Sequence, residues 1–164
     1  MNAPSNADGH GDRPSAPKAA ESATAIIRVP LSVRWGDLDA FNHVNNAAFL
    51  DYVQEARLHW MTSLDGAWLD DAQMPVVAAA HVNFRQQLTW PANIVVELRI
   101  ERVGRSSVTI AHRITASSDA TRLYADGDTV LVWIDRKSGQ SIALPAAIRA
   151  ACQSPLASAG TTSK

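Results

Sequence analysis

The sequence has little cysteine and no long apolar run. Cys152 is the only cysteine among 164 residues, so no disulfide can form within the chain, and the composition suits a reducing compartment. No apolar stretch approaches the roughly 20 residues that a membrane-spanning helix needs. The first residues also lack the apolar segment of a secretory signal. We therefore expect a cytoplasmic protein that has no membrane partner.

Strong net charge is also missing. With 15 basic and 16 acidic residues, the formal net charge is -1, so no strong field draws the chain to nucleic acid. The histidines and carboxylates show no spacing typical of metal ligands, and no pattern indicates a cofactor. We expect neither a nucleic-acid partner, nor a metal, nor a cofactor.

Large apolar residues are almost absent from both ends of the chain. Residues 1–24 are rich in Ala, Ser, Pro, Asn, Asp and Gly, and residues 154–164 are similar. Such segments bury too little surface to offset their conformational entropy. We therefore predict a disordered N-terminal tail, one folded domain over residues 25–153, and a flexible C-terminal tail.

The folded part begins with a predicted strand, followed by a predicted helix. Apolar and polar residues alternate from Ile27 to Trp35, and Pro30 favours an edge position in a sheet. After a polar loop, apolar residues recur at helical spacing over about 46–63. The apolar stripe consists of Phe49, Val53, Ala56, Trp60 and Leu64, with Leu50, Tyr52 and Met61 on its flanks.

Four further strands are predicted after the helix. They lie at Val76–Arg85, Ile94–Ile100, Ser106–Ala116 and Leu123–Asp135, separated by short turns and a break at Gly104. The alternation runs through Val76, Ala78, Ala80, Val82 and Phe84 in the first of them, and through Val130, Val132 and Ile134 in the last. Short turns force neighbouring strands to run antiparallel, so we predict an α+β fold of one long helix against an antiparallel sheet.

The loop from Trp35 to Asn46 contains the residues best suited to chemistry. Seven of its twelve residues are Asp, Asn, His or Gly, which are also common turn formers and helix caps. A catalytic interpretation is equally open. The first N–H groups of the following helix lack internal partners and favour an oxyanion, and Asp39 lies shortly before them. A carboxylate beside such donors suits hydrolysis, with Asp39 as nucleophile or as base for a water.

Three pieces of the sequence resemble the signature of the hydroxybenzoyl-CoA thioesterase branch of the hotdog superfamily. They are Trp35-Gly36-Asp37-Leu38-Asp39, His43-Val44-Asn45-Asn46 and Glu55-Ala56-Arg57. The resemblance extends from about Ile26 to Arg149 and implies a hotdog fold, in which an antiparallel sheet wraps around a long central helix. It also implies a thioesterase that hydrolyses an acyl-CoA, or an acyl-carrier-protein thioester, to the free acid.

The resemblance implies roles for individual residues. Asp39 corresponds to the catalytic carboxylate, and the backbone N–H of Asn46 corresponds to the donor that polarises the thioester carbonyl. His43 matches a spacing found in plant-type acyl-carrier-protein thioesterases, and its role is either catalytic or structural. Asn42 stands where the family usually has Gly, but Asn tolerates a positive φ better than most residues.

A second group of residues is expected to bind the substrate. Arg102, Arg105 and Ser106 flank Gly104, where family members hold the phosphates of CoA, and Arg suits phosphate well. A solvated strand end would explain the same residues equally well. The resemblance further implies a homodimer or homotetramer with active sites at the dimer interface, and the strand Val76–Phe84 is the edge expected to pair with its twin.

Two other functions remain open at this point. An enoyl-CoA hydratase or dehydratase of the hotdog type would carry a Pro between Asp39 and His43, and none is present. A non-catalytic acyl-CoA binding module would not need Asp39. Arg57 is expected to hold a structural carboxylate such as Glu55 or Asp51, and the acyl chain is not specified by any spacing.

Overall fold

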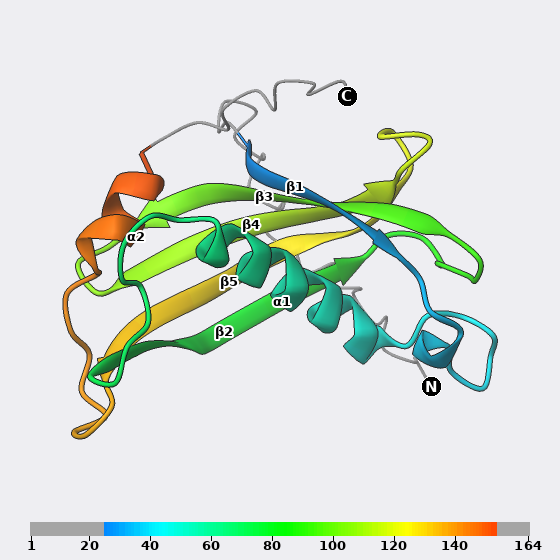
Figure 1. Ribbon diagram of the computed structural model, residues 1–164. Coiled ribbons are helices and arrows are strands. Elements are labelled where there is room, and N and C mark those ends of the chain that lie inside the picture. The colour runs from blue at the N-terminus through cyan, green and yellow to red at the C-terminus, as the bar shows by residue number, and fades with distance from the viewer. Residues whose placement is uncertain (1–24, 154–164) are drawn as a thin grey trace, which may run out of the picture.

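The computed structural model describes residues 25–153, so both predicted tails lie outside the described residues. Eight elements follow one another, as Figure 1 shows. They are β1 (Ala25–Ser32), the short helical turn η1 (Trp35–Asp37), α1 (Asn46–Thr62), β2 (Gln73–Phe84), β3 (Asn93–Val103), β4 (Ser107–Ala116), β5 (Leu123–Asp135) and α2 (Ala146–Ala151). No helix in this part of the chain is long and apolar enough to cross a membrane.

The five strands form one antiparallel sheet in the order β1-β3-β4-β5-β2. The three strands that follow one another through short turns, β3 to β5, occupy its middle. Strands β1 and β2 form its edges in this chain, which accommodates Pro30 in β1. The predicted α+β arrangement with an antiparallel sheet is confirmed.

Helix α1 has 17 residues and crosses one face of the sheet (Figure 1). Its predicted stripe is buried from Phe49 to Trp60, while Leu50 on the flank is 43 % exposed. The sheet contributes completely buried residues beneath it, among them Val96, Leu98 and Ile114. Burial of apolar surface at this layer is the main source of stability for the arrangement.

The first strand ends earlier than the alternation predicts. The pattern places Trp35 on the buried face of a strand, but Trp35 lies in η1 and is 74 % exposed. The reason lies two residues further on, because the carboxylate of Asp37 accepts hydrogen bonds from the backbone and side chain of Arg34. This contact turns the chain after Ser32 and overrides the strand pattern.

Two strands depart from the pattern that the sequence indicated. In β2 the register shifts between Val77 and Ala79, and Ala78 and Ala80 of the predicted apolar face are exposed. Beyond the bulge, Val82 packs against the core and Phe84 contacts Phe49, as the alternation predicts. In β5 the buried residues are Thr129, Leu131 and Trp133, whereas the predicted set through Val130 lies on the less buried face. Both faces of β5 carry apolar residues, so alternation within the strand did not distinguish them.

Candidate active site

The loop between η1 and α1 is a tight, hydrogen-bonded hairpin. The N–H of Asn45 donates to the carbonyl of Asp37 at 2.8 Å, and the N–H of Asp39 donates to the carbonyl of His43 at 2.8 Å. At its tip, Asn42 has a φ of 64°. This is the left-handed region that favours Gly and that Asn tolerates, so the replacement of the usual Gly preserves the turn.

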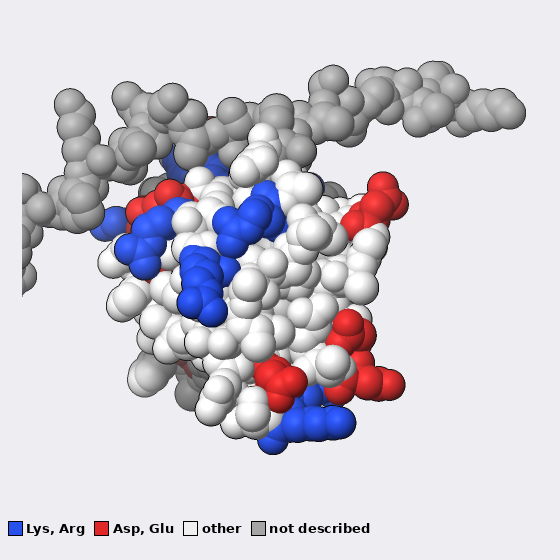
Figure 2. All heavy atoms as spheres, turned by 90° about the vertical axis from the view of Figure 1, so that its left-hand side faces the viewer, with Lys and Arg blue, Asp and Glu red and all other residues white. Residues whose placement is uncertain are grey.

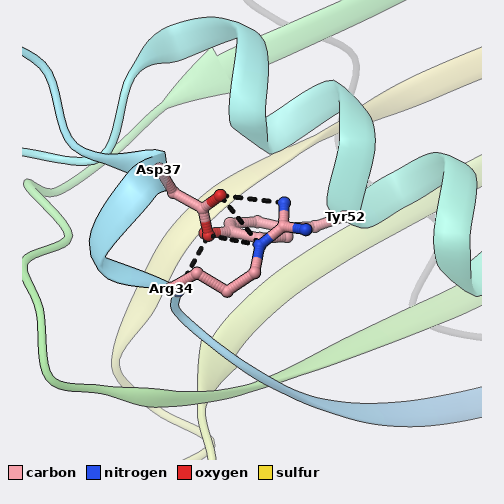
Figure 3. Close-up of polar contacts among 3 residues, drawn as sticks. All are labelled: Arg34, Asp37 and Tyr52. Atoms are coloured by element: carbon pink, nitrogen blue, oxygen red, sulfur yellow. Dashed lines mark hydrogen bonds and ion pairs between the residues drawn. The ribbon is translucent and has the colours of Figure 1, made fainter.

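Asp37 fixes this hairpin to α1 (Figure 3). Its carboxylate is buried and accepts from the guanidinium of Arg34, with the shortest contact at 2.8 Å, and from the hydroxyl of Tyr52 on α1 at 2.7 Å. Burial alone would raise the pKa of Asp37, but the hydrogen bonds from Arg34 and Tyr52 outweigh it and lower that pKa. Burial, followed by the neighbouring Asp37, raises the pKa of Tyr52. Asp37 is therefore an ionised structural group.

Asp39 has a different environment, although it is only two residues away. Its carboxylate is half-buried, and the Oδ1 atom accepts from the backbone N–H groups of Phe41 at 2.8 Å and of His43 at 3.3 Å. Within residues 25–153, no donor contacts Oδ2. One oxygen is therefore held in position by the loop, while the other is free to act on a ligand.

The first turn of α1 provides a hydrogen-bond donor close to Asp39 in the chain. Asn45 caps the helix, because its side chain accepts from the N–H of Ala47 at 2.8 Å and its carbonyl accepts from Ala48 at 2.9 Å. The N–H of Asn46 finds no acceptor among the described residues. A free amide at the positive end of a helix is suited to an oxyanion.

The three predicted catalytic residues, Asp39, His43 and Asn46, line one pocket of about 320 Å³. The opposite wall is the segment from Phe84 to Leu88, at the end of β2 and beyond it. Leu88 connects the two walls, since its carbonyl accepts from the N–H of Val44 at 2.8 Å. Sequence reasoning did not include this wall, although its polar run directly after a strand was a visible signal.

The predicted substrate-binding residues lie elsewhere in the chain. Arg102, Arg105 and Ser106 belong to the end of β3 and the turn to β4, and none of them lines the pocket of Asp39. This turn is held by Arg149 of α2, whose guanidinium donates to the carbonyls of Gly104 and Arg105 at 3.1 Å each. In Figure 1 the turn lies near α2 and the C-terminal end of α1, opposite the Asp39 loop.

Figure 2 shows this end of the molecule and a gathering of basic side chains on its upper part. Arg102 and Arg105 are exposed and Ser106 is half-buried. The residues are accessible to an anion, but in a single chain the structure does not bring them to the catalytic candidates.

Other reactive groups are excluded from this pocket. Burial raises the pKa of the Cys152 thiol to about 11, so it is a poor nucleophile at neutral pH. His112 is buried in the sheet, and neither ring nitrogen has a partner among the described residues. Among residues 25–153, no cluster of three or more His, Cys, Asp or Glu side chains is placed to hold a metal ion.

Comparison with known proteins places this architecture in a family. The model of the thioesterase-like superfamily matches residues 33–152. The long-chain acyl-CoA thioesterase FadM of Escherichia coli (strain K12) is 25 % identical over 125 residues, which cover 75 % of this chain and 94 % of that protein.

Two solved structures agree with this match. A Xanthomonas campestris protein assigned as an acyl-CoA thioesterase is 50 % identical, with 71 % of this chain and 99 % of that chain covered and a TM-score of 0.65. A Thermus thermophilus thioesterase, solved with coenzyme A and Zn, is 35 % identical, with 77 % and 97 % covered and a TM-score of 0.66. The chain therefore belongs to the thioesterase-like superfamily and is a thioester hydrolase.

Proposed function

We propose that the protein hydrolyses an acyl-CoA thioester to the free acid and CoA at the pocket of Asp39. The observation that carries this proposal is the arrangement of two groups in one pocket. The Asp39 carboxylate has a free oxygen, and the Asn46 N–H has no acceptor among the described residues, and both residues line the same space. A positioned carboxylate beside an oxyanion donor is what thioester hydrolysis needs.

The chemistry proceeds in one of two ways from this geometry. Asp39 attacks the carbonyl carbon, the thiolate of CoA leaves, and water then hydrolyses the resulting anhydride. Alternatively, Asp39 takes a proton from a water as that water attacks. In both cases negative charge develops on the carbonyl oxygen, and the N–H of Asn46 stabilises it. We assign His43 a positioning role, because its backbone N–H holds Oδ1 of Asp39.

The placement of Arg102, Arg105 and Ser106 supports a site shared between two chains. We infer a homodimer in which the β2 edges of two chains pair through a two-fold axis. The two sheets would then form one continuous sheet, and α1 of each chain would lie across the same face of it, as in a hotdog fold. Such an axis reverses one chain relative to the other, so the β3–β4 turn of one chain approaches the Asp39 end of its partner. The three residues would then hold the CoA phosphates of a substrate bound at the partner's Asp39.

The exposed surface beside β2 supports this pairing. Apolar residues there include Val77, which is 52 % exposed, Phe84, which is 49 % exposed, and Leu58 on α1, which is 41 % exposed. An unpaired strand edge with apolar neighbours is a surface that proteins normally cover.

A panel of acyl-CoA thioesters, with acyl-carrier-protein thioesters beside it, tests the function. We expect free thiol to appear with at least one aliphatic or aromatic acyl group, at a rate that depends on Asp39. A change in enoyl absorbance without thiol release would instead indicate a hydratase. Tight binding of the whole panel without turnover would indicate a binding module, and either result would contradict the proposal.

A further inference from the structure

The carboxylate of Asp37 joins three segments of the chain. It accepts hydrogen bonds from the backbone N–H of Arg34 at 2.8 Å, from Nε of the same arginine at 3.0 Å, and from the hydroxyl of Tyr52 at 2.7 Å. The three residues lie just after β1, in η1 and on α1 (Figure 3). Asp37 is 7 % exposed and Tyr52 is 4 % exposed, so this Arg34–Asp37–Tyr52 network has its centre inside the protein.

The backbone of Asp37 is also connected to both groups of the proposed catalytic pair. Asp37 lies two positions before Asp39, and its carbonyl accepts from the N–H of Asn45, the residue before Asn46. Tyr52 lies six positions after Asn46 on the same helix (52 minus 46), which is about 9 Å along its axis. The main chain of Asp37 therefore holds the start of α1, and its side chain holds the helix nearly two turns further on. Two contacts at this separation fix the orientation of the helix relative to the hairpin, which a single contact would not do.

The other contacts of the catalytic pair are local. The carboxylate of Asp39 accepts only from backbone N–H groups of its own hairpin among the described residues, and the side chain of Asn45 caps only the first turn of α1. Within the part of the chain that the structure describes, the contact of Tyr52 with Asp37 is the only side-chain hydrogen bond between α1 and residues 34–44. The position of the hairpin relative to the helix therefore depends on this contact.

The protonation states of the two partners favour a strong contact. Burial, followed by the hydrogen bond to Asp37, raises the pKa of Tyr52, so its hydroxyl keeps the proton that it donates. Burial alone would raise the pKa of Asp37, but the hydrogen bonds from Arg34 and Tyr52 outweigh it and lower that pKa, so the acceptor stays ionised. Hydrogen bonds to an ionised group are shorter and stronger than neutral ones. The ring of Tyr52 also packs edge-to-face on Phe49, with the ring centroids 6.3 Å apart.

We propose that Tyr52 is a positioning residue for the hydrolysis of the thioester. Through Asp37, its hydroxyl holds the carboxylate of Asp39 at its working distance from the N–H of Asn46. This role rests on the proposed function, in which those two groups act on one carbonyl. Catalytic groups must be held to within about 0.5 Å of their productive positions, and a misplacement of about 1 Å costs on the order of a hundredfold in rate. Tyr52 does not line the pocket, so it acts through Asp37 and not on the substrate.

The variant Tyr52→Phe tests this role, because it removes the hydroxyl and keeps the ring that packs on Phe49. Thiol release from the best acyl-CoA of the panel, measured well below the melting temperature, gives kcat and KM. We expect kcat to fall about tenfold or more and KM to stay within about twofold, as when an interaction needed only in the transition state is lost. Unchanged kcat would overturn the role even if the melting temperature fell, since the network would then serve stability alone. A higher KM at unchanged kcat would also overturn it, since Tyr52 would then act in substrate binding.

Tyr124→Phe is the matched control for this variant. Tyr124 is the only other tyrosine of the chain, and it is likewise 4 % exposed. Its hydroxyl has no hydrogen-bond partner within residues 25–153, and its ring contact with Arg122 is kept by phenylalanine. We expect kcat to be unchanged in this variant.

A double variant separates positioning from a general loss of stability. In the Asp39→Asn background, Tyr52→Phe should cost no further activity, because the group that it positions has already been removed. Equal fractional losses in the two backgrounds would show that the two side chains act independently, and would overturn the role.

Two substitutions of Arg34 test the network even if Tyr52→Phe does not fold. The side chain of Arg34 is 70 % exposed and pairs with a carboxylate that is 6 % exposed. Arg34→Gln should lower kcat several-fold, and Arg34→Lys should retain most of the activity because it keeps the charge and a donor. Arg28→Gln is the control, since it removes a 61 % exposed arginine from the 11 % exposed carboxylate of Glu97, outside the pocket. Equal kcat in Arg34→Gln and Arg28→Gln would overturn the role of the network.

These measurements separate the role of Tyr52 from the proposed function. If the natural sequence released no thiol from any member of the panel, the proposed function would fail and the role of Tyr52 with it. Turnover by the natural sequence, together with unchanged kcat in Tyr52→Phe, would overturn the role of Tyr52 alone.

Discussion

At the scale of single residues, two carboxylates in one loop have separate tasks. The carboxylate of Asp37 accepts hydrogen bonds from Arg34 and Tyr52 and has a structural role. Asp39 has one oxygen fixed by backbone N–H groups and another directed to no donor in the described part of the chain. Their difference arises from the fold around them, because the two side chains are chemically identical.

Replacement of Asp39 by Asn should lower kcat by about a hundredfold or more, because a positioned acid–base or nucleophilic group is lost. Thiol release from the best acyl-CoA of the panel measures the effect. The melting temperature should change little, since within the described residues the side chain accepts hydrogen bonds from two backbone N–H groups. Asp71→Asn, an exposed change of the same kind, is the control. Near-normal turnover in Asp39→Asn would remove Asp39 from the mechanism.

His112 should make the protein sensitive to acid. Burial, followed by the charge of Arg57, lowers its pKa to about 4 from a usual value of 6.5. The folded state therefore holds a neutral ring, and the unfolded state takes up a proton below pH 6.5. The stability present above that pH is lost as the pH falls towards 4, on the order of 3 kcal/mol over the whole interval.

The variant His112→Leu should remove this part of the acid sensitivity. It replaces a buried ring, whose two nitrogens have no partner within residues 25–153, by an apolar side chain, so stability at pH 7 should be equal or higher. Denaturant unfolding at pH 7 and pH 4.5 measures the difference, with His59→Gln on the exposed face of α1 as the control. A pH dependence that is identical in His112→Leu and the natural sequence would show that His112 does not titrate in this range.

At the scale of elements, the β3–β4 turn is built as a rigid and exposed support. Hydrogen bonds from Arg149 and from the backbone of Leu144 hold its carbonyls. The side chains of Arg102 and Arg105 are exposed and remain accessible to an anion. A turn fixed in this way holds the charges of Arg102 and Arg105 at defined positions on the surface, outside the core.

Arg105→Ala should weaken CoA thioesters more than short acyl-pantetheine thioesters. A contact to phosphate matters only when the nucleotide is present, so KM for the CoA substrate should rise several-fold while kcat stays nearly constant. Lys137→Ala removes one positive charge from the turn after β5 and serves as the control. Equal losses on both substrates would assign Arg105 a structural role.

At the scale of the whole molecule, the two groups of residues in the proposed site lie far apart within one chain. The loop that carries Asp39 and the β3–β4 turn that carries Arg105 lie at opposite ends of α1 (Figure 1). Val77 on β2 and Leu58 on α1 expose apolar side chains in this region. A two-fold axis along this edge would cover the apolar surface and complete the site with one self-complementary contact.

Light scattering should therefore find at least a dimer of the 17.6 kDa chain. On dilution, thiol-releasing activity per chain should fall over the concentration range in which the dimer dissociates. The two curves should coincide, because each site would need residues from both chains. A stable monomer with full activity per chain would contradict both the shared sheet and the shared site.

The sequence by itself determined the parts that depend on neighbours along the chain. Asp39, His43 and Asn46 lie within eight positions, and local hydrogen bonds and a helix start bring them together. The stripe of α1 and the alternation in β3 and β4 likewise follow from periodic burial. Asn42 allows the turn at the tip of the Asp39 loop, because Asn tolerates the positive φ that this position requires.

Only the tertiary structure decided what depends on distant segments. The segment from Phe84 to Leu88 lies across the pocket from Asp39. It lies there because β2 occupies the edge of the sheet opposite β1 and ends beside the loop that carries Asp39. The buried face of β5 was set by its tertiary contacts, in which Thr129 accepts from Arg57 and Trp133 donates to the carbonyl of Trp68, since both faces of the strand carry apolar residues. Arg57 forms no ion pair with a carboxylate among residues 25–153, because Glu55, two positions away on the helix, points to another side and pairs with His59. Periodicity in the sequence shows which positions are apolar, but the partners of a side chain are determined only by the packing of the helix against the sheet.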